Sequence, residues 1–281
     1  MVTRRGMLRG GLLTAVGAAT ALAGSGQVKH WFGWDRPPLG GGYAAAADDL
    51  GAVAHGGVQI HYFRATTEKL VALTFDDGPL PEYTPQFLDV LDEARAPATF
   101  FMVGRHLEEH AGLVRHRLGR HEVGNHSWSH DDLATLDLAG ARRELERTHE
   151  AIKRHTGREA TLLRPPYGHL GGSTVLAADS MGYDIALWSH QMRERRYAGD
   201  PTAQAQDLID TMRPGSIVLA HDAGDKRRLV ALNALPAMIA ALQERGYRFV
   251  TVSELLRSPS EGRPAEARSA SFSASLEPSS G

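Results

Sequence analysis

The alternation of strand-like and helix-like segments constrains the fold of this chain most strongly. Short apolar runs recur between residues 70 and 252, and segments with the apolar spacing of helices follow them. The predicted strands are Leu70–Phe75, Ala98–Val103, Glu122–Asn125, Thr161–Leu163, Asp184–Trp188, Ser216–Ala220 and Arg248–Val252. Strands that alternate with helices pair in parallel through right-handed crossovers. The sequence therefore predicts an α/β fold, either an open doubly wound sheet or a closed barrel.

Three segments show the helical pattern most clearly. They are Thr84–Ala94, Leu138–Arg154 and Leu229–Arg245. Pro236 lies inside the last of them, and proline removes a helical hydrogen bond, so we expect a kink or a break there.

The two ends of the chain differ in character from its middle. Residues 1–23 combine Arg4 and Arg5 with a short apolar run, which predicts a twin-arginine-type signal peptide; an uncleaved membrane anchor is the alternative. The Gly- and Ala-rich residues 24–57 predict a flexible linker, and residues 258–281 a disordered tail. Residues 58–257 are left as the folded domain, and the chain is expected to be secreted or to lie in the cell envelope.

Composition excludes several kinds of chemistry. The formal net charge of −2 gives no general attraction to nucleic acid or to anionic membranes. Cysteine is absent, so disulfides, thiolate metal sites and cysteine nucleophiles are excluded, and any metal must be held by His, Asp or Glu. No stable membrane span is expected once the signal is removed, and the oligomeric state is left open.

Polar side chains stand where the predicted strands end. These residues are Asp76, Asp77, His126, Arg164, Trp188 and His221. Parallel α/β folds place active residues at the carboxyl ends of their strands, so we expect these side chains to share one rim.

Two adjacent carboxylates, Asp76 and Asp77, are followed by Gly78-Pro79. Neighbouring side chains on a strand point to opposite faces, so both can serve one site only if the backbone turns there. One could then bind a metal while the other takes a proton. A turn with two solvated acids is the alternative.

His126 and His130 lie four residues apart, a spacing that a helical turn would place on one face. Two imidazoles and one carboxylate, with positions left open for water, are typical of a catalytic zinc site. A histidine pair alone is weak evidence in a chain with 14 histidines, and the neighbouring Asp pair strengthens it. A mononuclear iron oxygenase uses the same ligand types and is a third possibility.

Two further segments suggest catalytic and substrate-binding residues. Arg164-Pro165-Pro166-Tyr167 is a stiff loop that could hold a cation beside Asp76 and direct the Tyr167 amide at an oxyanion. His221 ends an apolar strand, and a histidine suits protonation of a leaving amine. Leu219 and Trp188 could form an apolar wall for an acetyl methyl group, although core packing explains such residues as well.

In chain order, the motifs Thr-Phe-Asp-Asp-Gly-Pro, His-Ser-x-x-His, Arg-x-Pro-Tyr and Leu-x-His closely resemble the polysaccharide deacetylases (NodB-homology domain, carbohydrate esterase family 4). The resemblance runs from about Lys69 to Leu256. It implies a distorted (β/α)7 barrel of parallel strands with outer helices. It further implies that Asp76 is the general base and His221 the general acid, that Asp77, His126 and His130 bind a divalent metal, that Arg164 tunes Asp76, and that Leu219 lines the acetyl pocket. Tyr167 is expected beside them as a catalytic residue, and Trp188 and Pro166 as substrate-binding residues.

The segment after the fifth predicted strand departs from the family pattern. Gln191 stands where an Asp is expected and Arg195 where a Trp is expected, while Glu194 could supply the missing carboxylate. Substrate preference or the pKa of His221 is therefore expected to be unusual.

The sequence thus predicts an exported deacetylase that hydrolyses N-acetyl groups of peptidoglycan or of a chitin-like N-acetylglucosamine polymer. Its metal is expected to be zinc, with cobalt, nickel or manganese as alternatives. An O-acetyl esterase of the acetyl-xylan type would use the same site. An inactive carbohydrate-binding module is the alternative from another class.

Overall fold

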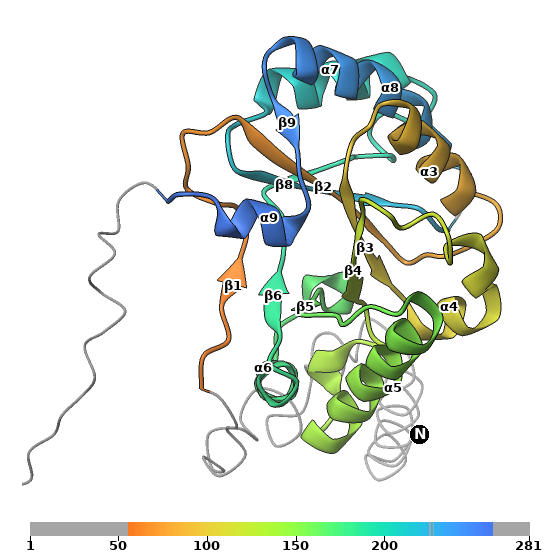
Figure 1. The fold of residues 1–281 in the computed structure, drawn as a ribbon, viewed down its shortest axis with the longest axis vertical. Coiled ribbons are helices and arrows are strands. Elements are labelled where there is room, and N and C mark those ends of the chain that lie inside the picture. The colour runs from red at the N-terminus through yellow and green to blue at the C-terminus, as the bar shows by residue number, and fades with distance from the viewer. Residues whose placement is uncertain (1–55, 225, 227, 261–281) are drawn as a thin grey trace, which may run out of the picture. The chain divides into compact units, whose positions relative to one another are not determined.

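The computed structural model describes residues 56–224, 226 and 228–260, and its secondary structure is drawn in Figure 1. The predicted signal peptide, nearly all of the predicted linker and most of the predicted tail lie outside these residues. No helix within the described ranges is long and apolar enough to cross a membrane. The chain divides into two compact units, whose described parts are residues 56–59, 103–105 and 125–185, and residues 60–102, 106–124 and 186–260.

The second unit is built on parallel strands around β2 (Leu70–Asp76). In this unit the strand order is β3-β2-β8-β7, and β9 also pairs with β2. The other strands are β1 (Ile60–His61), β3 (Ala98–Met102), β7 (His190–Gln191), β8 (Ser216–His221) and β9 (Arg248–Phe249). Every residue of β2 is buried, because it lies between β3 and β8. This burial on both faces explains why its sequence is a continuous apolar run rather than an alternating one.

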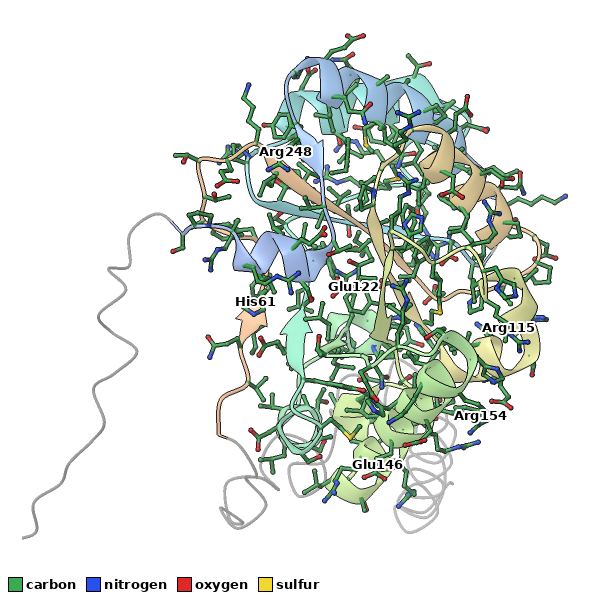
Figure 2. All side chains as sticks on the ribbon, in the orientation of Figure 1. His61, Arg115, Glu122, Glu146, Arg154 and Arg248 are labelled. Carbon is green, nitrogen blue, oxygen red and sulfur yellow. The ribbon has the colours of Figure 1, made fainter. Side chains whose placement is uncertain are left out.

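Helices accompany these strands (Figure 1). They are α3 (Thr84–Glu93), α4 (Gly104–His110), η2 (Ala111–Leu113), α7 (Pro201–Thr211), α8 (Arg228–Glu244) and α9 (Val252–Arg257). The core includes packed aromatic rings: the Phe75 ring is tilted against that of Phe87, 5.1 Å between centroids, and stacked on that of Phe100 at 5.2 Å. Glu122 ties α9 to β3, since its carboxylate accepts from Thr99 Oγ1 at 2.8 Å and from Ser253 N at 3.1 Å (Figure 2).

The first unit contains the end of β4 (Glu122–Asn125), β5 (Leu162–Leu163) and most of β6 (Asp184–Ala186). These strands are parallel, with Asn125 opposite Leu163 and Leu163 opposite Ile185. The helical segments are η3 (Leu133–Thr135), α5 (Leu138–Thr156), η4 (Pro166–Gly168) and α6 (Gly172–Ser180). The α5 helix is defined at both ends, because the Asp137 side chain accepts from Gly140 N and Gly157 ends the helix with φ 68°.

Three sequence-based expectations need correction. The predicted strand Asp184–Trp188 ends at Ala186 and a separate short strand, β7, follows it. The predicted strand Arg248–Val252 ends at Phe249, because Thr251 and Glu254 form a capping box that starts α9 at Val252. At Pro236 a kink or a break was expected, and the helix does not break there. The α8 helix continues through this proline, and the burial of eight of its residues, Leu235 and Met238 among them, outweighs a cost of about 3 kcal/mol.

Candidate active site

Asp76 and His221 end two neighbouring parallel strands. They are direct partners in the register of β2 and β8, and the Asp222 amide donates to the Asp76 carbonyl at 3.2 Å. Asp76 is 3% exposed, while the side chain of His221 is 23% exposed. The structure therefore places a buried carboxylate and an accessible imidazole side by side at the ends of two strands.

The backbone leaves the extended conformation at Asp77. Its φ is 78°, a left-handed value that few residues other than glycine adopt. His106 Nδ1 lies 2.6 Å from the Asp77 carbonyl oxygen and ties α4 to this turn. The expected turn after the Asp pair is confirmed, although it begins one residue earlier than Gly78-Pro79. The peptide bond between Gly78 and Pro79 is cis.

Gly78 lies directly against the buried carboxylate of Asp222. A Cβ at position 78 would overlap the Asp222 carboxylate, so only glycine fits. Thr84 Oγ1 donates to Asp222 Oδ2 at 2.6 Å, which links the start of α3 to the end of β8. Burial raises the pKa of Asp222 to about 7, against the hydrogen bond from Thr84, and the charge of Asp77 raises it further. No local sequence pattern indicates this role of Asp222, because its contact with Thr84 joins residues 138 positions apart.

The raised pKa of Asp222 predicts a specific pH dependence of stability. Between its ordinary pKa of 3.8 and about 7, the folded protein holds a proton on Asp222 that the unfolded chain releases. Asp222 therefore lowers the free energy of unfolding progressively as pH rises through this window. Asp222→Asn removes the titration, so the stability of the variant relative to wild type should increase between pH 4 and pH 7 by a few kcal/mol at most.

Urea unfolding of the metal-free protein at several pH values measures this difference. Asp89→Asn, at a side chain that is 70% exposed, is the matched control and should follow the wild-type curve. Parallel pH curves for wild type and Asp222→Asn would show that Asp222 does not titrate in this range.

In the first unit, His126 and His130 lie on a loop and not on a helical turn. The expected helical turn is wrong, because Ser127 and His130 adopt left-handed φ values of 63° and 64°. These two kinks fold the loop back so that the two imidazole centroids still lie 5.1 Å apart. The two rings therefore lie close together, as expected, but a kinked loop brings them together and not a helical turn.

Hydrogen bonds from two neighbouring elements hold this loop. Asn125 Oδ1 accepts from Ser127 N at 3.0 Å, and Ser127 Oγ accepts from His130 N at 3.0 Å. Glu144 of α5 accepts from the amides of Trp128 and Ser129 at 3.0 and 2.8 Å. Sequence reasoning missed Glu144 because it lies on a helix face rich in charged residues.

The Arg164 backbone fixes the orientation of His126. His126 Nδ1 lies 2.7 Å from the Arg164 carbonyl oxygen, and a carbonyl only accepts, so Nδ1 carries the proton. This tautomer leaves the lone pair on Nε2, the arrangement in which a histidine commonly binds a metal. Arg164 itself is fully buried, and its amide donates to the Asn125 carbonyl at 3.0 Å.

The loop after Arg164 presents an exposed aromatic ring. Tyr167 is 61% exposed and left-handed, with φ 62°, while Pro166 beside it is buried. The Tyr167 ring lies 5.0 Å from that of His130 and 5.6 Å from that of His169. Within the first unit the structure therefore groups Arg164, Tyr167 and the two histidines, as predicted.

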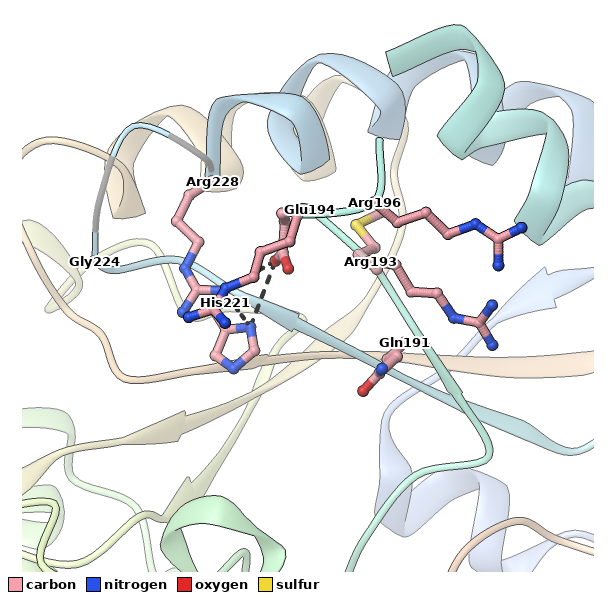
Figure 3. A pocket seen from close by; sticks show the side chains of 9 residues that line it. Gln191, Arg193, Glu194, Arg196, His221, Gly224 and Arg228 are labelled. Atoms are coloured by element: carbon pink, nitrogen blue, oxygen red, sulfur yellow. Dashed lines mark hydrogen bonds and ion pairs between the residues drawn. The ribbon is translucent and has the colours of Figure 1, made fainter. Parts of the chain in front are cut away.

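Glu194 and Arg228 surround His221, as Figure 3 shows. Arg228 Nη1 lies 3.0 Å from His221 Nδ1 and 3.1 Å from Glu194 Oε1, which is 3.5 Å from the same His221 nitrogen. Burial alone would raise the pKa of Glu194, but its hydrogen bond with His221 and the charge of Arg228 outweigh this and hold the pKa below its usual range. The charged form of Glu194 therefore lies beside the imidazole, in the place considered for it from the sequence. Arg228 was missed, because a helix-start arginine carries no distinguishing pattern.

The two predicted apolar wall residues lie in different surroundings. Leu219 is buried two residues before His221 on β8. Trp188 lines a cavity of about 420 Å³ with His190 and Thr211, whereas His221 lines another cavity of about 500 Å³.

The predicted metal ligands are two imidazoles in the first unit, His126 and His130, and one carboxylate in the second unit, Asp77. One carboxylate and two imidazoles are ligand types of catalytic zinc sites, and the His126 tautomer fits that use. Such a ligand set, in a chain that also pairs an aspartate with a histidine, is typical of metal-dependent hydrolases.

Comparison with known proteins gives the family. Residues 63–186 match the polysaccharide deacetylase family. A peptidoglycan-N-acetylglucosamine deacetylase of Bacillus cereus is 38% identical over 68% of this chain and 89% of its own length. The peptidoglycan-N-acetylmuramic acid deacetylase PdaC of Bacillus subtilis is 34% identical over 67% of this chain and 39% of its own. The chain belongs to the polysaccharide deacetylase family, whose deacetylases hydrolyse carbon–nitrogen bonds other than peptide bonds.

Solved structures agree with this family. A peptidoglycan N-acetylglucosamine deacetylase structure matches with a TM-score of 0.67 and 28% identity, over 72% of this chain and 95% of the other. This likeness confirms the predicted fold class, parallel strands with surrounding helices. A carbohydrate esterase family 4 pseudoenzyme from Bacillus anthracis matches with a TM-score of 0.65 and 28% identity, over 71% of this chain and 69% of the other. Because the fold also occurs in a pseudoenzyme, only particular residues, and not the fold, can support catalysis.

Proposed function

We propose that this protein is an exported, metal-dependent deacetylase that hydrolyses N-acetyl groups of peptidoglycan or of a chitin-like N-acetylglucosamine polymer. The observation that carries the proposal is the pairing of Asp76 with His221 at the ends of β2 and β8. In this proposal, that pair supplies the base and the acid that amide hydrolysis needs. Relatives named as peptidoglycan deacetylases support the substrate class. Export by the twin-arginine route is proposed from Arg4, Arg5 and the apolar run within residues 1–23.

Asp77, His126 and His130 would hold the metal, preferably zinc. When bound, a divalent ion supplies Lewis acidity toward a carbonyl oxygen and makes water more acidic. The contact of His126 Nδ1 with the Arg164 carbonyl presents Nε2 as the ligand atom. Asp76 is the last residue of β2, and at Asp77 the backbone turns out of the strand with a left-handed φ. The two neighbouring acids therefore do not share one backbone conformation and can have different roles.

Proton transfer falls to the residues that the metal does not use. Asp76 takes a proton from the attacking water, and Arg164 stabilises the charged form of Asp76. The Tyr167 amide donates to the oxyanion that forms at the acetyl carbon. His221 then protonates the leaving amine, with its imidazole held by Glu194 and Arg228. Leu219, Trp188 and Pro166 contribute apolar surface for the acetyl group and the sugar.

Acetate release from three substrates tests this proposal. The metal-loaded protein is assayed on N-acetylglucosamine oligomers, on peptidoglycan and on acetylated xylan, with Asp77→Ala as the control. Release from an amide substrate that is lost in the control supports the proposal. Release from xylan alone would make the protein an O-acetyl esterase, and no release from any substrate would favour a binding module.

A further inference from the structure

The cavity beside His221 carries a concentration of positive charge that the proposed reaction does not need. It has a volume of about 500 Å³ and is lined by His221, Glu194 and four arginines: Arg193, Arg195, Arg196 and Arg228. The chain as a whole has a net charge of −2, so this charge is a local feature. It also runs against the family pattern, since Gln191 and Arg195 stand where an Asp and a Trp are expected.

Only one of the four arginines has its charge matched within the cavity. Arg228 pairs with Glu194 at 3.1 Å, and Glu194 is the one carboxylate in the lining. Arg193, Arg195 and Arg196 are exposed, and within the described part of the chain no carboxylate lies within ion-pair distance of them. Arg196 instead lies over the Tyr197 ring, 5.4 Å from its centroid. Three guanidinium groups are thus available to an anion that enters from solvent.

The backbone holds this loop firmly against the strand that ends in His221. Gln191 is in register with Leu219, and the Met192 amide donates to the Leu219 carbonyl at 2.8 Å. A tight turn follows, in which the amides of Arg196 and Tyr197 donate to the Arg193 carbonyl at 2.9 and 3.1 Å. Figure 3 shows the side chains of Arg193 and Arg196 running from this loop to the same side. The backbone of this loop is therefore fixed beside the strand that ends in His221, and in Figure 3 the side chains of Arg193 and Arg196 extend from it away from the imidazole, toward solvent.

We propose that Arg193, Arg195 and Arg196 determine substrate specificity by binding a carboxylate carried by the glycan near the acetyl group that is removed. Guanidinium groups bind carboxylates through charge-assisted and often bidentate hydrogen bonds, which makes arginine the suited residue. The preferred substrate is then an N-acetylated glycan with acidic substituents, and a neutral N-acetylglucosamine oligomer is a poorer one. This inference rests on the proposed deacetylase function and names the substrate class for that site.

The test compares kcat/KM on two substrates of equal length, a neutral N-acetylglucosamine oligomer and an oligomer that contains N-acetylmuramic acid. The ratio of the acidic to the neutral substrate should exceed one for the wild type and fall with added salt. Arg195→Gln combined with Arg196→Gln should lower this ratio by roughly tenfold. The double lysine variant at the same positions should keep much of it, because the charge remains.

Arg115→Gln is the matched control, since Arg115 is exposed and does not line the cavity (Figure 2). It should leave the ratio unchanged. Glycans with and without their attached peptides, compared in the same assay, separate a carboxylate on the sugar from one on a peptide. If the ratios are equal in the wild type and the glutamine variant and acetate is released from both substrates, the role of the arginines is overturned and the deacetylase function is not affected. Absence of acetate from both substrates would instead count against the deacetylase function itself.

Discussion

Replacement of Asp76 by Asn should lower kcat for deacetylation by about 10²–10⁴ and change KM little. The reason is that the amide keeps the shape of the carboxylate but cannot take a proton from water. Asp76 is buried and lies opposite His221, so no solvent-exposed group replaces it in that position. Steady-state kinetics on an N-acetylated oligomer, with the metal content of each protein measured, gives the two constants.

Asp89→Asn is the control for this variant, because Asp89 lies on α3 and makes a partly exposed surface ion pair with Arg117. It should retain wild-type kcat. An Asp76→Asn enzyme that keeps its kcat and loses only substrate affinity would show that Asp76 binds substrate and is not the base. Loss of metal from the variant would place Asp76 among the ligands instead.

Replacement of Phe75 by Ala should lower the free energy of unfolding by about 3–5 kcal/mol. Phe75 is fully buried in the middle of β2, and its ring packs against those of Phe87 and Phe100. Alanine removes this apolar surface and leaves a cavity that the strands on both sides of β2 cannot close. Chemical denaturation followed by circular dichroism measures the change.

Phe63→Ala is the matched control, since Phe63 is 57% exposed and should cost no more than about 0.5 kcal/mol. Similar losses for the two variants would contradict the placement of Phe75 in the core. Because Phe75 directly precedes Asp76, the Ala variant should also lose activity at temperatures below its unfolding transition.

The elements that the sequence predicted well are those determined by local pattern. The buried β2 strand is a continuous apolar run, and its observed end at Asp76 is within one residue of the prediction. Residues that follow such strands, Asp76 and His221 above all, were predicted to meet because parallel strands end at one edge. The helix Leu138–Thr156 extends two residues beyond its predicted end, up to the Gly157 cap.

Features that depend on distant contacts were not predictable in the same way. The loop from His126 to His130 was expected to be helical, and its left-handed residues are held by Glu144, a side chain from α5. Ser127 and His130 have left-handed φ values but are not glycines, so the sequence does not indicate this conformation. Asp222 likewise acts through contacts with Gly78 and Thr84, far from it along the chain. Arg228 lies only seven residues from His221, but no spacing rule connects the two.

The central claim is N-deacetylation of a cell-wall glycan, and the most direct measurement counts both products in one reaction. Purified peptidoglycan is incubated with the metal-loaded protein, and released acetate and new free amino groups on the glycan are quantified together. The account predicts equal amounts of acetate and amine, and neither product with Asp77→Ala. Acetate without new amino groups, or no acetate from a protein that contains its metal, would contradict it.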